Sequence, residues 1–412
     1  MPSQNQSFER ISNLAIFPVS RANPFDPPLD FARIRDQNSL SRLQYPDGHT
    51  GWLAANYTVA RAILSDPRFS ITTQRPPVRR PRPDPLADIT DVEKGALSKQ
   101  LAFTDPPEHT QRRRILAGRF TARRVKAHRP IIERIVSDQI DHMMALGPPV
   151  DFVEHFALPV PSRTLCALLG VPENDRHQFE NPMKVIGNPD AAPDQLSQSI
   201  RDFINYARSS ISEKRRNPSD DILSVLASYD ELSELELAGI AMQLFAAGHD
   251  TTASMLALGT YALLAHSQWG KIVLDSEKIG LTVEELLRYL TIFQLGAFTR
   301  TASEDVEISG TLIRAGESIT VALAAANRDP QVFESPDTLN VIRDGRSNLA
   351  FGHGIHKCLG QHLARLEMKI SFRALIERLP TLNLALPSHR IPICNENMFI
   401  HGVERLPVEW DL

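Results

Sequence analysis

The sequence is poor in cysteine, in excess charge of either sign and in long apolar runs. Its 412 residues include 3 cysteines, too few for a disulfide framework, which favours a reducing compartment. The 45 basic and 49 acidic residues leave a net charge of −4, which argues against general nucleic-acid binding. No run of about 18 apolar residues, as a transmembrane helix requires, and no secretory signal is present. These absences predict a soluble, cytoplasmic protein that binds neither nucleic acid nor membrane.

Proline is also absent from the middle of the chain. Of the 30 prolines, 24 lie within the first 218 residues and 6 lie after residue 329, so the segment 219–329 has none. Because proline breaks helix interiors, this segment is suited to long helices. The proline- and arginine-rich stretch 75–85 is predicted to be a loop or a polyproline-like segment, either an interdomain linker or a long surface loop over a cavity.

Hydrophobic patterning predicts a mainly helical protein. Ser233 and Glu236 form a capping box, which predicts a helix from Glu234 to about His266. Further helices are predicted at 283–289 and 359–378, breaks between helices at 147–149, 159–161 and 182–196, and short strands at 51–54, 297–301, 306–308, 312–313 and 318–323. The predicted fold class is therefore mainly α with smaller β-sheets (α+β).

The decapeptide Phe-Gly-His-Gly-Ile-His-Lys-Cys-Leu-Gly at 351–360 places three glycines around Cys358, just before a predicted helix. A thiol at a helix N-terminus beside Lys357 and His356 is expected to have a depressed pKa, typical of a nucleophile or a metal ligand. His353 and His356 could join Cys358 in a zinc site, although a fourth donor would be needed. A buried cysteine in a tight turn is the remaining alternative.

This decapeptide resembles the cysteine-ligand loop of the cytochrome P450 superfamily, F-G-x-G-x-H-x-C-x-G, at every fixed position. The resemblance implies a single-domain cytochrome P450 fold with a long central helix over haem. It implies an N-terminal tail at 1–19 and one haem-binding domain at 20–412. It also implies that Cys358 is the axial thiolate ligand of haem b iron, which favours O–O cleavage. Phe351, His356 and Gly360 would be further haem-binding residues.

A second segment, Ala-Gly-His-Asp-Thr-Thr at 247–252, lies in the middle of the predicted long helix. Glycine and adjacent threonines are locally unfavourable there, which suggests a functional site. The segment looks like the family's oxygen-activation motif, A-G-x-[DE]-T-[TS]. The resemblance implies that the helix opens locally for dioxygen and that Asp250 and Thr251 relay protons as the catalytic pair.

Two further groups of polar residues match family segments. Glu285 and Arg288, three residues apart on one helix, resemble the structural E-x-x-R pair, which Arg343 would complete. The segment D-P-P-E-H-x-x-x-R at 105–113 and the arginine at 300 resemble family segments that bind the haem propionates. The propionate ligands implied in this way are His109, Arg113, Arg300 and His356.

The substrate side of the molecule carries a departure from the family. Many relatives have a proline shortly after the E-x-x-R helix, whereas residues 291–294 here are Thr-Ile-Phe-Gln. The resemblance implies mostly apolar pocket walls with arginines at 75, 79, 80 and 82, which suggests a medium-sized hydrophobic substrate with an anionic group. The implied pocket residues are Phe245, Ala246, Leu295, Gly296, Ala297, Phe298, Met398 and Phe399.

The segment from His109 to Arg129, both included, has eight lysine or arginine residues and no acidic one. Such a run is usually a solvated helix face, but in this family it implies docking of an acidic ferredoxin-type donor. The sequence shows no flavin or nicotinamide fingerprint, so electrons from NAD(P)H would arrive through that ferredoxin and its reductase.

The resemblance thus implies a monomeric haem-thiolate monooxygenase. It would insert one atom of dioxygen into a small to medium organic substrate, in secondary or xenobiotic metabolism. Alternatives within the haem-thiolate class are a nitric oxide reductase and a peroxygenase. Alternatives from other classes are a zinc or cysteine hydrolase that uses His353, His356 and Cys358, and a non-catalytic haem protein.

Overall fold

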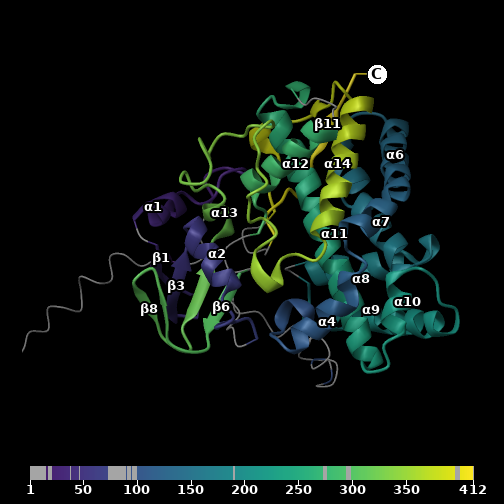
Figure 1. Cartoon of the computed structure of the whole chain (residues 1–412). Helices are drawn as coiled ribbons and strands as arrows, with labels where there is room; N and C mark the ends of the chain where they lie inside the picture. The colour runs from purple at the N-terminus through teal and green to yellow at the C-terminus, as the bar shows by residue number, and fades with distance from the viewer. Residues whose placement is uncertain are drawn as a thin grey trace, which may run out of the picture.

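The computed structural model describes residues 15–16, 21–37, 39–45, 47–72, 90, 94, 100–188, 191–271, 276–293, 298–394 and 400–411. A helical body lies on one side and a smaller region of strands, with α1 and α2, on the other (Figure 1). The α-helices are α1 (Leu29–Gln37), α2 (Tyr57–Ser65), α4 (Glu108–Ala117), α5 (Ala122–Ala127), α6 (Arg129–Leu146), α7 (Pro159–Leu169), α8 (His177–Gly187), α9 (Pro193–Arg216), α10 (Ile222–Ala227), α11 (Glu234–Ala265), α12 (Ser276–Leu290), α13 (Leu323–Ala326) and α14 (Gln361–Arg378).

The strands form three small sheets within the described part of the chain. The largest has the order β1-β2-β3-β9-β6-β4, in which β3 pairs parallel to β9 and β9 pairs antiparallel to β6. The strands are β1 (Ala15–Ile16), β2 (Ser41–Gln44), β3 (Thr50–Ala54), β4 (Phe69–Ser70), β5 (Val150–Asp151), β6 (Thr299–Ala302), β7 (Val306–Ile308), β8 (Thr311–Ile313), β9 (Ser318–Val321), β10 (Asn383–Leu384) and β11 (Pro407–Glu409). The predicted mixture of helices and small sheets is confirmed.

Helix α11 is the centre of the helical body. It begins at the predicted capping box, in which the Ser233 hydroxyl accepts a hydrogen bond from the Glu236 N–H and the Glu236 carboxylate accepts one from the Ser233 N–H. The helix is apolar on most of its surface because α7, α9, α12 and α14 all pack against it. A helix that is hydrophobic all round is buried in this way, and α11 therefore holds its central segment inside the protein.

Two predicted boundaries of helices are wrong. Residues 182–196 were expected to form one loop, but α8 continues through Pro182 to Gly187, and α9 already begins at Pro193. The reason is tertiary packing: Phe179 is fully buried, with its ring edge-on to Phe203 at 4.6 Å between centroids, which holds α8 despite the proline. Helix α12 likewise starts at Ser276, ahead of the predicted range 283–289, because its first turns are packed inside the protein through the buried Ile279. Tertiary packing of this kind outweighs the intrinsic helix propensity of single residues such as Pro182 and Gly280.

No helix in the described ranges is both long enough and apolar enough to cross a bilayer. The predicted loop at 75–85 lies outside the described residues.

Candidate active site

The Cys358 loop is held against the end of α2 by its glycines. Gly352 and Gly354 have φ angles of +69° and +72°, a region that favours glycine. A Cβ atom at Gly354 would lie 2.2 Å from the Leu64 carbonyl oxygen, so no other residue fits there without a shift of the backbone. The Cys358 N–H donates to the Phe351 carbonyl at 2.9 Å, which closes the loop around the sulfur.

The electrostatics of Cys358 differ from the prediction. Burial raises the pKa of the Cys358 thiol, whereas a depressed pKa was expected from the helix N-terminus and its neighbours. The N–H groups of Gly360 and Gln361 and the charges of Arg113 and Arg365 act in the opposite direction, but burial dominates. Such a thiol is a poor free nucleophile, and a bound metal ion would be needed to hold it as thiolate.

Four polar side chains gather beside this loop and form what we call the cationic cluster: His109, Arg113, Arg300 and His356. The His109 and His356 rings lie 4.2 Å apart, and Arg300 is only 3% exposed. Burial lowers the pKa of Arg300 to about 10, and burial followed by the Arg300 charge lowers the pKa of His356 to about 3. The structure thus brings together all four residues that the resemblance assigned to the haem propionates.

The cationic cluster lacks an adequate counter-charge within the described residues. Both ring nitrogens of His109 are buried without a hydrogen-bond partner there. The Asp105 charge raises the pKa values of Arg300 and His356, against the effect of burial. Its carboxylate, however, already accepts hydrogen bonds from the Ser70 hydroxyl and the Ile71 N–H. Buried polar groups of this kind need hydrogen-bond partners, and a group with two carboxylates would supply acceptors to the two arginines and to the histidines. The residues present therefore fit haem.

Arg113 connects the cluster to the cysteine loop. It projects from α4, and its Nη2 donates to the Lys357 carbonyl at 2.7 Å. One guanidinium therefore touches the backbone beside Cys358 and also belongs to the cationic cluster.

The central segment of α11 remains regular, in contrast to the local opening that was expected. The Thr251 hydroxyl donates to the Ala247 carbonyl at 2.6 Å, within an unbroken helix. The Asp250 carboxylate is 2.8 Å from Nδ1 of His249, and its side chain is 44% exposed. A Cβ atom at Gly248 would lie 2.9 Å from Leu165, so the glycine serves close packing against α7. Asp250 and Thr251 do lie next to each other, as predicted.

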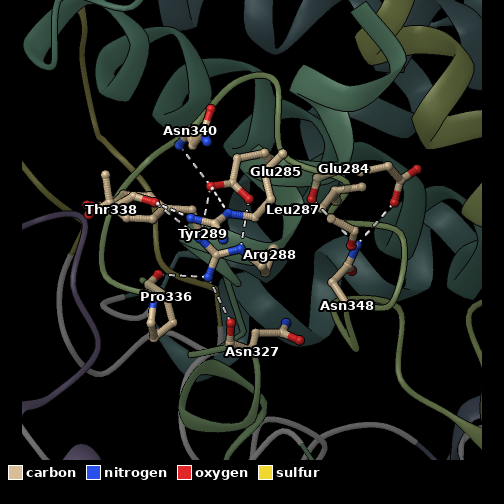
Figure 2. A network of polar contacts seen from close by, with 12 residues as sticks. Glu284, Glu285, Leu287, Arg288, Tyr289, Asn327, Pro336, Thr338, Asn340 and Asn348 are labelled. Carbon is tan, nitrogen blue, oxygen red and sulfur yellow. Dashed lines mark hydrogen bonds and ion pairs between the residues drawn. The ribbon is translucent and has the colours of Figure 1, made fainter. Parts of the chain in front are cut away.

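The E-x-x-R residues form the predicted buried network, which Figure 2 shows from close by. Glu285 and Arg288 are both fully buried and make two contacts of 2.8 and 2.9 Å. Arg343 completes the set, with its Nε 3.2 Å from Glu285. Arg288 also donates to the carbonyls of Asn327 and Pro336, so the network fixes the irregular segment that leads to the cysteine loop.

Sequence reasoning missed a second pair beside this network. Glu284 binds Arg365 of α14 at 2.5 Å, and the Arg365 guanidinium lies 4.4 Å from the centre of the Phe351 ring. The available signal was the second glutamate next to Glu285, but i and i+1 residues point in different directions on a helix, so its partner could not be inferred.

The proposed substrate residues are only partly described. Phe245 is fully buried against Phe179 and His249, with ring centroids 5.1 and 5.5 Å away. Phe298 is half-buried and lies edge-on to Phe293, and Ala246 is half-buried on α11. Leu295, Gly296, Ala297, Met398 and Phe399 lie outside the described residues. The role of the whole set in substrate binding stays a prediction.

The basic run is partly neutralised within the protein. Arg119 and Arg124 both pair with Asp220, and Arg112 is buried 3.6 Å from Glu236. Arg123 and Lys126 on α5 are exposed. Arg114 at the end of α4 is exposed as well, so the exposed charge of the run lies on α5 and on the last turn of α4.

Comparison with known proteins gives one consistent result. A sequence profile of the family described as Cytochrome P450 matches residues 179–271 and 280–398. Cytochrome P450 105C1 from a Streptomyces species is 40% identical, covering 96% of this chain and 98% of that protein. Pentalenic acid synthase from Streptomyces avermitilis is 39% identical, covering 97% of this chain and 98% of that protein. The crystal structure of GfsF, a cytochrome P450 of Streptomyces halstedii, is 41% identical with a TM-score of 0.86, covering 96% of this chain and 99% of that chain.

Proposed function

The chain belongs to the cytochrome P450 family, and from this premise we propose that Cys358 is the axial ligand of the haem iron, with the cationic cluster receiving the two haem carboxylates. The protein is a monooxygenase that uses haem, dioxygen and electrons from NAD(P)H, delivered through separate redox proteins, to oxidise a small organic molecule. These similarities give no support to the nitric oxide reductase, peroxygenase, hydrolase or carrier alternatives.

The observation that carries the site assignment is the cationic cluster beside the half-buried Cys358. A cysteine hydrolase would need an activated thiolate, whereas burial raises the pKa of Cys358. A zinc site would need a further donor, and no group of three or more His, Cys, Asp or Glu suited to a metal gathers in the described ranges. A haem ligand requires a single thiolate and a nearby site for carboxylates, which matches this arrangement.

When bound, haem supplies the iron centre at which dioxygen is activated, with one oxygen atom inserted into the substrate and the other leaving as water. The chain itself must then deliver protons while keeping bulk water out. Asp250 can exchange protons with solvent because its side chain is partly exposed. Thr251 lies beside it, and its hydroxyl can turn from the Ala247 carbonyl and pass a proton inward from Oγ1. His249, bonded to Asp250, holds that carboxylate in place.

The test of this proton path is Thr251→Ala. We expect the variant to keep its haem but to divert reducing equivalents to hydrogen peroxide, because a positioned proton donor contributes roughly 10²–10⁴-fold. Product formed per NAD(P)H consumed is the measurement, with hydrogen peroxide assayed in parallel. Thr251→Ser keeps the hydroxyl and is the matched control. Fully coupled turnover by Thr251→Ala would rule out the proposed role.

The exposed charges of α5 are proposed as the docking surface for an acidic ferredoxin-type donor. The double variant Arg123→Glu, Lys126→Glu is expected to raise the ferredoxin concentration at half-maximal turnover by about tenfold at low salt, because charge steering changes association to this degree. The difference should shrink near 0.1 M salt, where the screening length is about 10 Å. Arg33→Glu on α1, whose arginine pairs with Asp30 at the surface, is the control. Equal effects of the two charge reversals would place docking elsewhere.

The substrate proposed is a medium-sized hydrophobic molecule with an anionic group. The apolar side chains of Ala246, Phe293 and Phe298 support the hydrophobic part of this proposal. The proposal can be checked by the change of haem spin state that candidate substrates induce on binding.

A further inference from the structure

Adjacent glutamates of α12 hold arginines from different parts of the fold. Glu285 binds Arg288 and Arg343, whereas Glu284 binds Arg365 of α14 through both carboxylate oxygens, at 2.5 and 3.1 Å. The Glu284 and Arg365 side chains are 8% and 19% exposed, so the pair is largely removed from solvent. A bidentate pair in such a place is strong and fixes the plane of the guanidinium.

Three neighbours determine the position of the Arg365 guanidinium. Glu284 binds one edge, the Gln361 side-chain oxygen accepts from Nη1 at 3.1 Å, and the Phe351 ring lies 4.4 Å from Cζ. The group therefore stacks on the aromatic ring that begins the cysteine loop. Lysine has no planar fork and could not reproduce both the paired contacts and the stacking.

Glu284 also supports the chain just before Phe351. The Asn348 amide donates to Glu284 at 3.1 Å, a contact visible in Figure 2, and to the Gly345 carbonyl at 2.8 Å. The Asn348 side-chain oxygen accepts from the Ala350 N–H at 3.0 Å. Glu284 thus fixes both the backbone that leads to the Phe351 ring and the cation that covers that ring.

The Phe351 carbonyl also accepts the Cys358 N–H at 2.9 Å, so the Arg365 cation covers the residue that holds the backbone of Cys358 in place. We propose that Arg365 is a positioning residue that sets the reduction potential of the haem iron through Phe351 and Cys358. The inference rests on Cys358 being the iron ligand. The Arg365 cation would draw electron density from the thiolate and stabilise the reduced, less positive iron. Removal of this cation therefore favours ferric iron and makes the potential more negative.

The experiment compares three variants of the haem-loaded protein by redox titration of the iron. Arg365→Gln is expected to lower the equilibrium constant for reduction about tenfold, which is ~59 mV for one electron. Arg365→Lys keeps the charge without the stacking and should recover at least half of that change. The control is Arg373→Gln on the same helix, since Arg373 is exposed and pairs with Glu377. The control should match the unmodified protein.

The outcomes separate this inference from the ligand assignment. A red-shifted Soret band of the reduced carbon monoxide complex in the unmodified protein, lost in Cys358→Ser, establishes the ligand independently. With that band present, an unchanged potential in Arg365→Gln would overturn the inference. Equal shifts in Arg365→Gln and Arg365→Lys would also overturn it, because the charge would then not be the cause. If both variants lose haem while the control retains it, Arg365 is structural and the inference is wrong.

Discussion

Cys358→Ser is expected to lose the strongly red-shifted Soret band of the reduced carbon monoxide complex and to lose monooxygenation. Activity should fall below about 1% of the unmodified rate, because loss of even an outer-shell partner of a metal ligand costs roughly 10–100-fold. The physical reason is that serine cannot supply the electron donation of a thiolate, which favours O–O cleavage. The carbon monoxide difference spectrum and product formation are the two measurements.

The other thiols provide matched controls for this result. Cys166 lies in α7 and Cys394 lies near the C-terminus, so neither belongs to the glycine-rich loop beside the cationic cluster. Cys166→Ser and Cys394→Ser should therefore keep the red-shifted band. Retention of the band in Cys358→Ser, or its loss in either control, would show that the ligand had been assigned wrongly.

Glu285→Gln is expected to destabilise the protein by about 3–5 kcal/mol, since removing one partner leaves a buried charge uncompensated. Arg288 is fully buried, and Arg343 shares the same carboxylate, so two guanidinium groups lose their anion at once. The measurement is the free energy of unfolding by denaturant, together with the haem content of the purified protein.

A surface pair on α14 provides the control. Glu377→Gln removes the partner of the exposed Arg373, and such pairs contribute no more than about 1 kcal/mol. A loss of stability in Glu285→Gln that does not exceed that of Glu377→Gln would contradict a structural role for the buried network.

Local signals in the sequence determined the helices with strong caps. The capping box at Ser233 defined the start of α11, because both its hydrogen bonds form within four residues. The residues of the cysteine loop could be identified for a related reason. The positive φ angles of Gly352 and Gly354 favour glycine, so the two glycines in the sequence indicate the backbone conformation of the loop.

Boundaries that depend on tertiary packing could not be obtained in this way. Pro182 is a local signal for a break, yet the packing of Phe179 against Phe203, far along the chain, holds α8 through it. The pKa of Cys358 was misjudged for the same reason. Neighbours in the sequence predicted a depressed value, whereas burial by the rest of the fold raises it.

The sequence by itself determined which residues we propose for the site, and the tertiary structure decided how those residues contact one another. Cys358, Asp250, Thr251 and the Glu285–Arg288 pair lie in short motifs whose spacing is visible along the chain. The pairing of Glu284 with Arg365 joins residues 81 positions apart, and the cationic cluster joins α4, β6 and the cysteine loop. Burial and the distances between charged groups depend on how distant segments pack, so only the tertiary structure could show them.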